Sequence, residues 1–114
     1  MDIKKLFKLD LLDLNNKKKL QNEHMKKILS ESILPYRDKT YSELRQMIEQ
    51  NVDAFEATDE SGNSYNIEIE AFWDGKQGGN IRVVGCIDDD SFTKSISPLS
   101  DSFIKAPDES FVGE

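Results

Sequence analysis

The spacing of apolar residues changes about halfway along the chain. Up to residue 50, apolar residues recur every three or four positions, and one stripe is formed by Met25, Ile28, Leu29 and Ile33, which is typical of a helix with one buried face. From Ser64 onward, apolar and polar residues alternate, which is typical of a strand with one buried face. The pattern therefore predicts an α+β fold, with helices first and a sheet after them.

Two or three helices are expected before residue 51. The leucines of residues 3–14 surround the helix axis, and Asn15 and Asn16 favour helix ends, so a short first helix is separated from a second one that starts near Lys17. We expect the second helix to stop before Pro35, because a proline disfavours helical dihedral angles in the residue that precedes it.

A third helix is predicted over residues 41–50. Thr40 and Glu43 form a capping-box pattern, in which each side chain binds a backbone N–H that the first helical turn leaves unpaired. Asn51 marks the expected end of this helix.

Three strands are predicted after the helices. Residues 53–58 form a short strand, residues 59–63 a turn around Gly62, and residues 64–73 and 81–87 two longer strands joined by a glycine-containing loop. A register that buries the apolar residues of both longer strands together places Trp73 opposite Ile81, Ala71 opposite Val83 and Ile67 opposite Ile87.

The remaining segment is expected to complete the sheet. A turn is predicted at Asp88, Asp89 and Asp90. A fourth strand is predicted over residues 92–96, and a fifth over residues 103–106. The expected architecture is a single α+β domain over residues 1–114, in which two to three N-terminal helices pack on one face of a four- to five-stranded antiparallel meander.

Charge is distributed unevenly along the chain. The formal net charge is -7 at pH 7, and residues 1–50 hold eleven Lys and Arg against eight Asp and Glu, whereas residues 51–114 hold four against fourteen. The sheet half is therefore acidic, which argues against nucleic acid as a partner. No apolar run approaches the roughly 18 residues that span a bilayer, so we expect no membrane association. Cys86 is the only cysteine, which excludes an internal disulfide and favours a reducing, cytoplasmic location.

The second half of the chain resembles a bacterial protein family. Two stretches carry the resemblance, YNIEIEAFWDGKQGGNIRVVGCIDDDSF from Tyr65 and PLSDSFIKAPDESFVGE from Pro98. They are similar to those of a family of small acidic bacterial α+β proteins for which no activity or catalytic residue is established. The family tends to have glycines in the turns where this chain has Asp90 and Glu109, so the resemblance implies backbone strain at these two residues if the turns need a positive φ.

Two residues were considered for nucleophilic catalysis. His24 is the only histidine, so any triad must use it, but its position at the edge of a helix stripe among lysines favours a partly exposed helix residue. Cys86 is expected on the outer face of the sheet beside Glu68, where acidic neighbours disfavour the thiolate that a nucleophile needs. We therefore assign no catalytic residue.

The carboxylates of the sheet half suggest a second type of chemistry. Glu68 and Glu70 share one strand face, with Arg82 as the expected counter-ion, and Asp88–Asp90 offer oxygen ligands for Ca²⁺ or Mg²⁺. The spacing does not match the calcium loop, which needs alternate acidic residues, a central glycine and a distal glutamate. We therefore assign no metal and no cofactor, and a small metal-assisted hydrolase using Asp88–Asp90 with Glu68 or Glu70 remains the alternative function.

The function that the sequence favours is binding without catalysis. An acidic sheet face with an aromatic anchor suits a protein partner with a basic surface, and the expected contact residues are Glu68, Glu70, Phe72, Asp88, Asp89 and Asp90. In size and charge the chain is similar to immunity proteins of bacterial toxin systems, so neutralisation of a basic toxin is one form of this hypothesis. Self-association through residues 1–14 is a further alternative, because the leucines there do not form one stripe.

Overall fold

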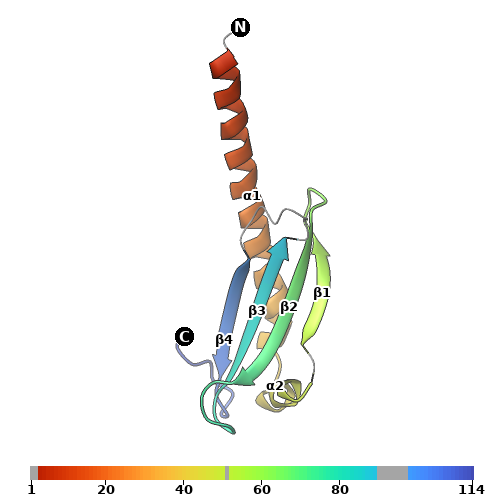
Figure 1. Ribbon diagram of the computed structural model, residues 1–114. Coiled ribbons are helices and arrows are strands. Elements are labelled where there is room, and N and C mark those ends of the chain that lie inside the picture. Colours follow the sequence, from red (N-terminus) through yellow and green to blue (C-terminus); the bar gives the residue numbers. More distant parts are fainter. Residues whose placement is uncertain (1–2, 51, 90–97) are drawn as a thin grey trace.

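The protein combines two helices with one four-stranded sheet. The computed structural model describes residues 3–50, 52–89 and 98–114, with side chains from residue 15 onward. The elements are α1 (Ile3–Arg37), α2 (Tyr41–Ile48), β1 (Asp53–Thr58), β2 (Ser64–Trp73), β3 (Ile81–Asp89) and β4 (Leu99–Lys105). The strands are antiparallel in the order β1-β2-β3-β4, and both helices lie on the same face of the sheet (Figure 1). The predicted α+β fold is confirmed, with two helices and four strands in the part of the chain that is described.

Helix α1 is longer than the sequence suggested. It runs without interruption through Asn15 and Asn16, so the predicted break between two helices is wrong. Asparagine costs a helix only about 0.5 kcal/mol relative to alanine, and two such residues do not outweigh the good helix formers on both sides. Within the described residues, no helix carries an apolar stretch long enough to cross a membrane.

Pro35 does not end α1 either, because the helix continues to Arg37. Tertiary contacts hold the last turn in place. The Tyr36 hydroxyl donates to Asp53 Oδ2 at 2.6 Å, and the Arg37 guanidinium lies 4.4 Å from the centre of the Phe111 ring. These contacts offset the backbone hydrogen bond that the proline removes.

Helix α2 begins as predicted and ends two residues early. The Glu43 N–H donates to Thr40 Oγ1 at 3.2 Å, and the Thr40 N–H donates to Glu43 Oε1 at 3.1 Å, which completes the capping box. This bond to the backbone holds the pKa of Glu43 below its ordinary value. Leu44 is fully buried against the sheet, so α2 covers the part of the sheet that α1 leaves open.

The predicted strands over residues 53–58 and 64–73 are confirmed, and so is the register between β2 and β3. Trp73 faces Ile81, Ala71 faces Val83, and Ile67 faces Ile87. This register turns one face of the sheet toward the helices. The buried core consists of Met25, Leu29, Ile33, Leu44, Tyr65, Ile67, Ile69, Ala71, Ile81, Val83, Ile87 and Phe103.

Helix α1 approaches β3 most closely at Gly85. A Cβ atom at this position would lie 3.1 Å from Leu29 Cδ1 and 3.5 Å from Ile33 Cδ1. A side chain would therefore push the helix away from the sheet, and glycine is the residue that allows this contact.

The end of β3 differs from the prediction. Asp88 and Asp89 belong to the strand, where they pair with Asn66 and Tyr65, so the turn predicted for these two residues is wrong. Asp90 and the predicted strand over residues 92–96 lie outside the described residues. The strand predicted over residues 103–106 is the second half of β4, which begins at Leu99.

The turn near the C-terminus contains the backbone strain that the family resemblance implied. Glu109 has a φ of 74°, a conformation that costs a residue with a Cβ atom about 1 kcal/mol or more. Its carboxylate compensates by accepting the Tyr41 N–H at 2.9 Å and by lying 3.3 Å from Lys105 Nζ. The Lys105 ammonium, which is almost fully buried, also donates to the Lys39 carbonyl at 2.6 Å.

Candidate functional site

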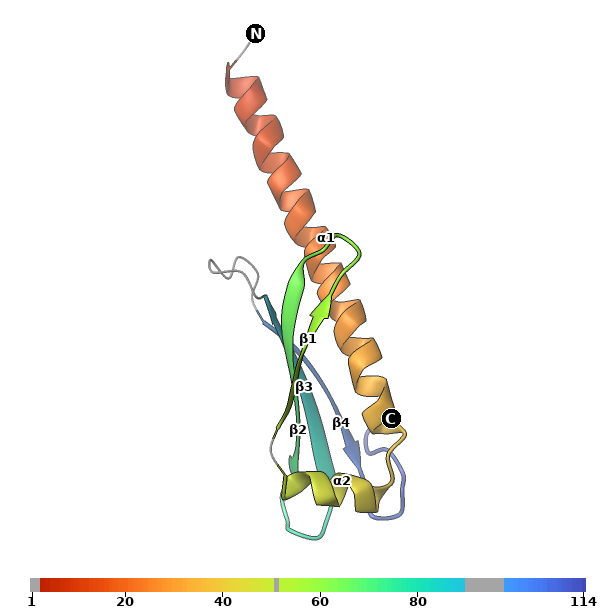
Figure 2. The same cartoon turned by 90° about the vertical axis from the view of Figure 1, so that its right-hand side faces the viewer.

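The face of the sheet that turns away from the helices is the candidate functional surface. None of the described helices covers it (Figure 2), and strand alternation places every second residue of each strand on it. Its members on the three strands β1, β2 and β3 are Ala54, Glu56, Thr58, Ser64, Asn66, Glu68, Glu70, Phe72, Arg82, Val84, Cys86 and Asp88. We call this surface the outer face.

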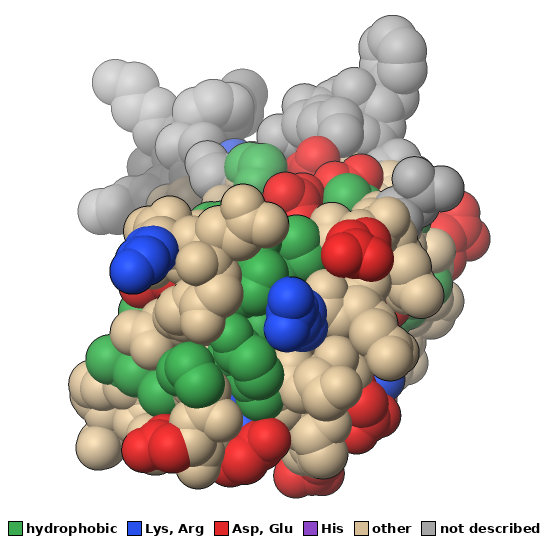
Figure 3. Space-filling view, turned by 90° about the horizontal axis from the view of Figure 1, so that it is seen from below, with side chains coloured by type: hydrophobic (Ala, Val, Ile, Leu, Met, Phe, Trp, Pro, Cys, Tyr) green, Lys and Arg blue, Asp and Glu red, His purple; other side chains and the backbone are tan. Residues whose placement is uncertain are grey.

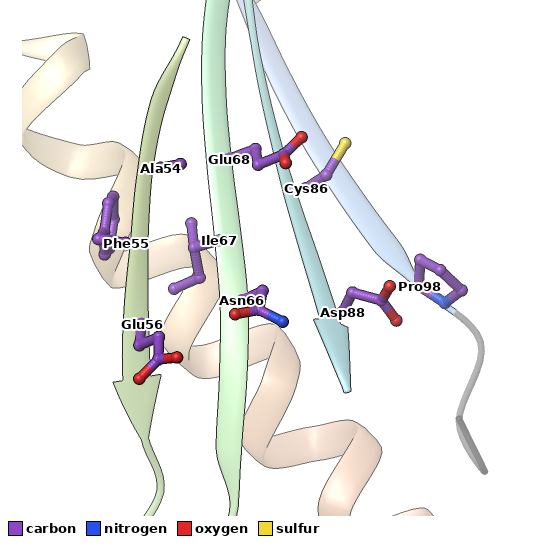
Figure 4. Close-up of a pocket in the computed structure, with 9 residues that line it drawn as sticks. All are labelled: Ala54, Phe55, Glu56, Asn66, Ile67, Glu68, Cys86, Asp88 and Pro98. Atoms are coloured by element: carbon purple, nitrogen blue, oxygen red, sulfur yellow. The ribbon is translucent and has the colours of Figure 1, made fainter. Parts of the chain in front are cut away.

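A hollow of about 510 Å³ lies on the outer face. It extends from β1 across β2 to β3 and Pro98, and its lining residues are Ala54, Phe55, Glu56, Asn66, Ile67, Glu68, Cys86, Asp88 and Pro98. Figure 4 shows the Glu68 carboxylate beside the Cys86 thiol, on directly paired residues of adjacent strands, with Asp88 farther along β3. The hollow is thus polar and acidic at its centre.

The charges of the outer face are mainly negative. Glu56, Glu68 and Glu70 are exposed and Asp88 is half-buried, while Arg82 is the one basic residue on the described outer face of β1, β2 and β3. The prediction that Arg82 is the counter-ion of the two β2 glutamates is wrong.

Arg82 is held by a residue from the neighbouring loop. Its Nε donates to Asp74 Oδ1 at 3.1 Å, and its NH1 lies 3.4 Å from Ser102 Oγ. Because Asp74 already neutralises Arg82, the glutamates of β2 keep their charge available for an outside group.

The residues predicted to bind a partner do not all share this face. Glu68 and Glu70 are exposed on it, and Phe72 is 37% exposed at the end of β2. Asp89 points to the opposite side of the sheet and is 3% exposed, so it cannot contact a partner on the outer face. The sequence misplaced it because three consecutive aspartates resemble a turn, and consecutive residues of a strand point to opposite faces. Asp90 lies outside the described residues.

The carboxylates do not assemble a metal site in the part of the chain that the structure describes. No three His, Cys, Asp or Glu side chains there come close enough together to hold an ion. Asp88 and Asp89 lie on opposite faces of the sheet, so these two cannot ligate one ion together. Cys86 is exposed, as predicted for the outer face.

A second cluster of polar residues, which the sequence did not reveal, surrounds Asp59 in the turn between β1 and β2. Its side chain is 2% exposed and accepts the Tyr65 hydroxyl at 2.7 Å and the Asn63 amide at 3.1 Å. The backbone N–H groups of Ser61 and Asn63 donate to its other oxygen, each at 2.9 Å. His24 Nδ1 lies 3.3 Å from Asp59 Oδ2.

These contacts shift two pKa values in opposite directions. Burial alone raises the pKa of Asp59, but the hydrogen bonds from Tyr65, Asn63 and His24 outweigh it and hold that pKa well below the ordinary value. Burial, together with the bond to the Asp59 carboxylate, raises the pKa of Tyr65 to about 12. Asp59 is therefore a charged acceptor that joins α1 to the β1–β2 turn.

The Asp59 cluster is organised for stability more than for catalysis. Hollows of about 230 Å³ and 390 Å³ adjoin His24, and a carboxylate behind a histidine is the arrangement of a general base. Here, however, both oxygens of Asp59 already accept hydrogen bonds from the turn and from Tyr65, and no Ser or Cys side chain among the described residues bonds to His24. The local signal for the turn was present in residues 59–63, but the contact with His24 spans 35 residues and has no local signal.

The end of the molecule formed by α2 and the β2–β3 loop has a different character. Figure 3 views this end and shows a band of hydrophobic side chains with Asp and Glu side chains along its margins. Trp73 is half-buried and packs against the core, and the Tyr41 hydroxyl donates to the Gly79 carbonyl at 2.7 Å. Aromatic side chains at this end are thus tied into the fold.

Comparison with known proteins adds no assignment: no protein-family model, no curated protein and no solved structure matches the chain.

Proposed function

We propose that the protein is a non-enzymatic binding protein that uses its outer face to hold a protein partner with a basic surface. The observation that supports this most directly is that none of the described helices covers the sheet face with Glu56, Glu68, Glu70 and Asp88, and that Arg82 on this face is already paired with Asp74. A surface with a negative electrostatic potential raises the rate of association with positively charged partners and disfavours acidic ones.

Phe72 would supply the localised affinity. It is 37% exposed, stands on the same face as the glutamates, and pairs across the sheet with Arg82. A partly exposed aromatic ring beside charged groups is a common anchor in protein interfaces, because it buries a large apolar area at a small cost in entropy. A basic toxin that is neutralised by covering its active surface is one concrete form of such a partner.

The test compares two triple variants in which the changes are matched. In the first, Glu68→Lys, Glu70→Lys and Phe72→Ala alter the outer face. In the second, Glu23→Lys, Glu31→Lys and Leu34→Ala make the equivalent changes on exposed positions of α1, where Leu34 is 55% exposed. A partner isolated on the immobilised wild-type protein is then titrated calorimetrically against all three proteins at low and high salt.

We expect the outer-face variant to bind at least tenfold more weakly than wild type, with a smaller dependence of affinity on salt, because charge complementarity is lost. The α1 variant should bind within about twofold of wild type, since single exposed charges contribute little. Equal affinity of the two variants for every isolated partner would overturn the proposal.

A second candidate, self-association through residues 1–14, is favoured by the position of α1. The helix extends well beyond the sheet in both views (Figures 1 and 2), the molecule is 67 Å long but only 26 Å and 22 Å wide, and residues 15–20 are all exposed. A helix segment without tertiary contacts is only marginally stable on its own, so a second copy packed on it would stabilise it. Sedimentation velocity of the full chain and of a variant lacking residues 1–14 tests this, and an unchanged monomeric mass in both would reject it.

A further inference from the structure

The edge of β1 that faces away from β2 is a second candidate binding surface, next to the outer face. Strand β1 lies at one end of the sheet order and, among the described strands, pairs only with β2. Figure 2 shows β1 on the near side of the molecule, with α1 to one side of it and no helix across its edge. An edge strand presents unpaired N–H and C=O groups, which can form hydrogen bonds with an added strand.

Strand β1 lacks three of the features that usually prevent such pairing. Its sequence, DAFEAT, contains no proline and no lysine, and its pairing with β2 is continuous from Asp53 to Thr58, without a bulge. Prolines, lysines and bulges are the common means by which proteins protect an edge strand. The protection that remains is the negative charge of Asp53 and Glu56, which disfavours an acidic added strand and not a basic one.

The helix side of β1 offers apolar surface. Phe55 pairs with Ile67 and so belongs to this side, where it is 41% exposed, and the neighbouring Val52 is 43% exposed. A hollow of about 150 Å³ at the Val52 end of the strand is lined mainly by apolar side chains, whereas a hollow of about 230 Å³ at the Thr58 end is lined mainly by charged and polar ones. Side chains of an added strand that point to this side would meet apolar groups at Phe55 and at the Val52 end.

The outer side of β1 is acidic. Glu56 stands there, and the 510 Å³ hollow continues from it toward Glu68. Because successive side chains of a strand point to opposite faces, an added strand that satisfies both sides of β1 would alternate apolar residues with Lys or Arg. A second copy of β1 suits the edge less well, since it would bring its own Asp53 and Glu56 to an acidic surface.

We propose that an extended segment of the partner, in which basic and apolar residues alternate, adds to β1 as a fifth strand, with its basic side chains over Glu56 and the adjoining hollow and its apolar side chains against Phe55. This inference rests on the proposed function for the charge of the partner. It adds the mode of recognition, in which backbone hydrogen bonds supply affinity and the alternating side chains supply specificity.

The experiment uses a seven-residue peptide of alternating Lys and Val and two backbone-methylated forms of it. One form is methylated at the backbone nitrogen of every Lys, and the other at the backbone nitrogen of every Val. In a strand, the N–H groups of residues that share a face point to the same edge, so only one of the two forms blocks pairing with β1. Binding to the full-length protein is measured by calorimetry, and protection of the β1 amides is followed by hydrogen exchange.

We expect one methylated peptide to lose at least tenfold in affinity while the other stays within threefold of the unmodified peptide, and we expect new protection in β1. Glu56→Lys should weaken the unmodified peptide at least fivefold, whereas the matched control Glu23→Lys on α1 should not. Equal loss or equal retention by both methylated peptides, absence of protection in β1, or absence of binding at millimolar peptide would each overturn strand addition.

The outcomes separate the two proposals. If the Glu68, Glu70 and Phe72 variant no longer binds the isolated partner but the two methylated peptides bind with equal affinity, the outer face holds the partner and strand addition is wrong. If one methylated peptide alone is blocked but that variant binds the isolated partner normally, strand addition holds and the proposed role of the outer face is wrong.

Discussion

Replacing Asp59 by alanine is expected to lower the free energy of unfolding by about 3 kcal/mol. In this variant the hydroxyl of the fully buried Tyr65 loses its acceptor, the Asp59 carboxylate at 2.7 Å. Because Gln21 still bonds to the Tyr65 hydroxyl, the loss of this bond costs an amount near the middle of the range of about 1–3 kcal/mol for an unsatisfied buried polar group. The N–H groups of Ser61 and Asn63 are exposed and return to water, so each bond contributes only about 0.5 kcal/mol.

Urea unfolding followed by circular dichroism measures this effect. Asp59→Asn, Tyr65→Phe and the double variant form a cycle, in which a coupling free energy of about 1 kcal/mol is expected because the two side chains are in direct contact. A loss of less than about 0.5 kcal/mol in Asp59→Ala, or strict additivity in the cycle, would refute the view that the carboxylate holds this end of the sheet to α1.

The same site makes stability depend on pH in a defined direction. The folded protein holds the pKa of Asp59 well below its ordinary value of 3.8, so the unfolded chain takes up a proton at a higher pH than the folded one. The contribution of Asp59 is therefore complete above the unfolded pKa and is lost as the pH falls from about 5 toward 2. The stability difference between wild type and Asp59→Asn should shrink over this range, and a constant difference would contradict the assignment.

Three further predictions concern other parts of the fold. Gly85→Val should destabilise the protein by about 2–3 kcal/mol in urea, because the side chain would collide with Leu29, 3.1 Å from the added Cβ atom; unchanged stability would show that α1 can shift freely. Thr40→Ala should cost about 1 kcal/mol through loss of the capping box with Glu43, and a cost below the error of the same titration would contradict it. Cys86 should react with a thiol-specific disulfide reagent in the native protein within about tenfold of its rate in unfolded protein, since it is exposed; a hundredfold slower reaction would mean that the outer face is covered.

The sheet could be predicted because its pattern is local and strong. In β2 the buried and exposed residues alternate from Tyr65 to Phe72, and once the register was fixed by burying Ile67 opposite Ile87, the composition of the outer face followed. Asp89 was misplaced because three consecutive aspartates resemble a turn, whereas the strand continues through Asp88 and Asp89.

Helix α1 and the Asp59 cluster could not be predicted in the same way. The asparagine penalties are small beside the good helix formers around them, and the last turn beyond Pro35 is held by tertiary contacts of Tyr36 and Arg37 with residues far along the chain. His24 is a partly exposed helix residue, as predicted, but its partner Asp59 is identified only when the β1–β2 turn is placed against the helix. Sequence patterns predict elements well and long-range polar pairs poorly.

The anchoring of α1 has a mechanical consequence. His24 at one end of the sheet and Arg37 at the other fix the helix at two points, and the stretch from Gln21 back to Ile3 spans about 27 Å as a helix at 1.5 Å per residue. Because a helical segment without a packed neighbour is only marginally stable, this stretch becomes a rigid spacer when a second molecule packs on it.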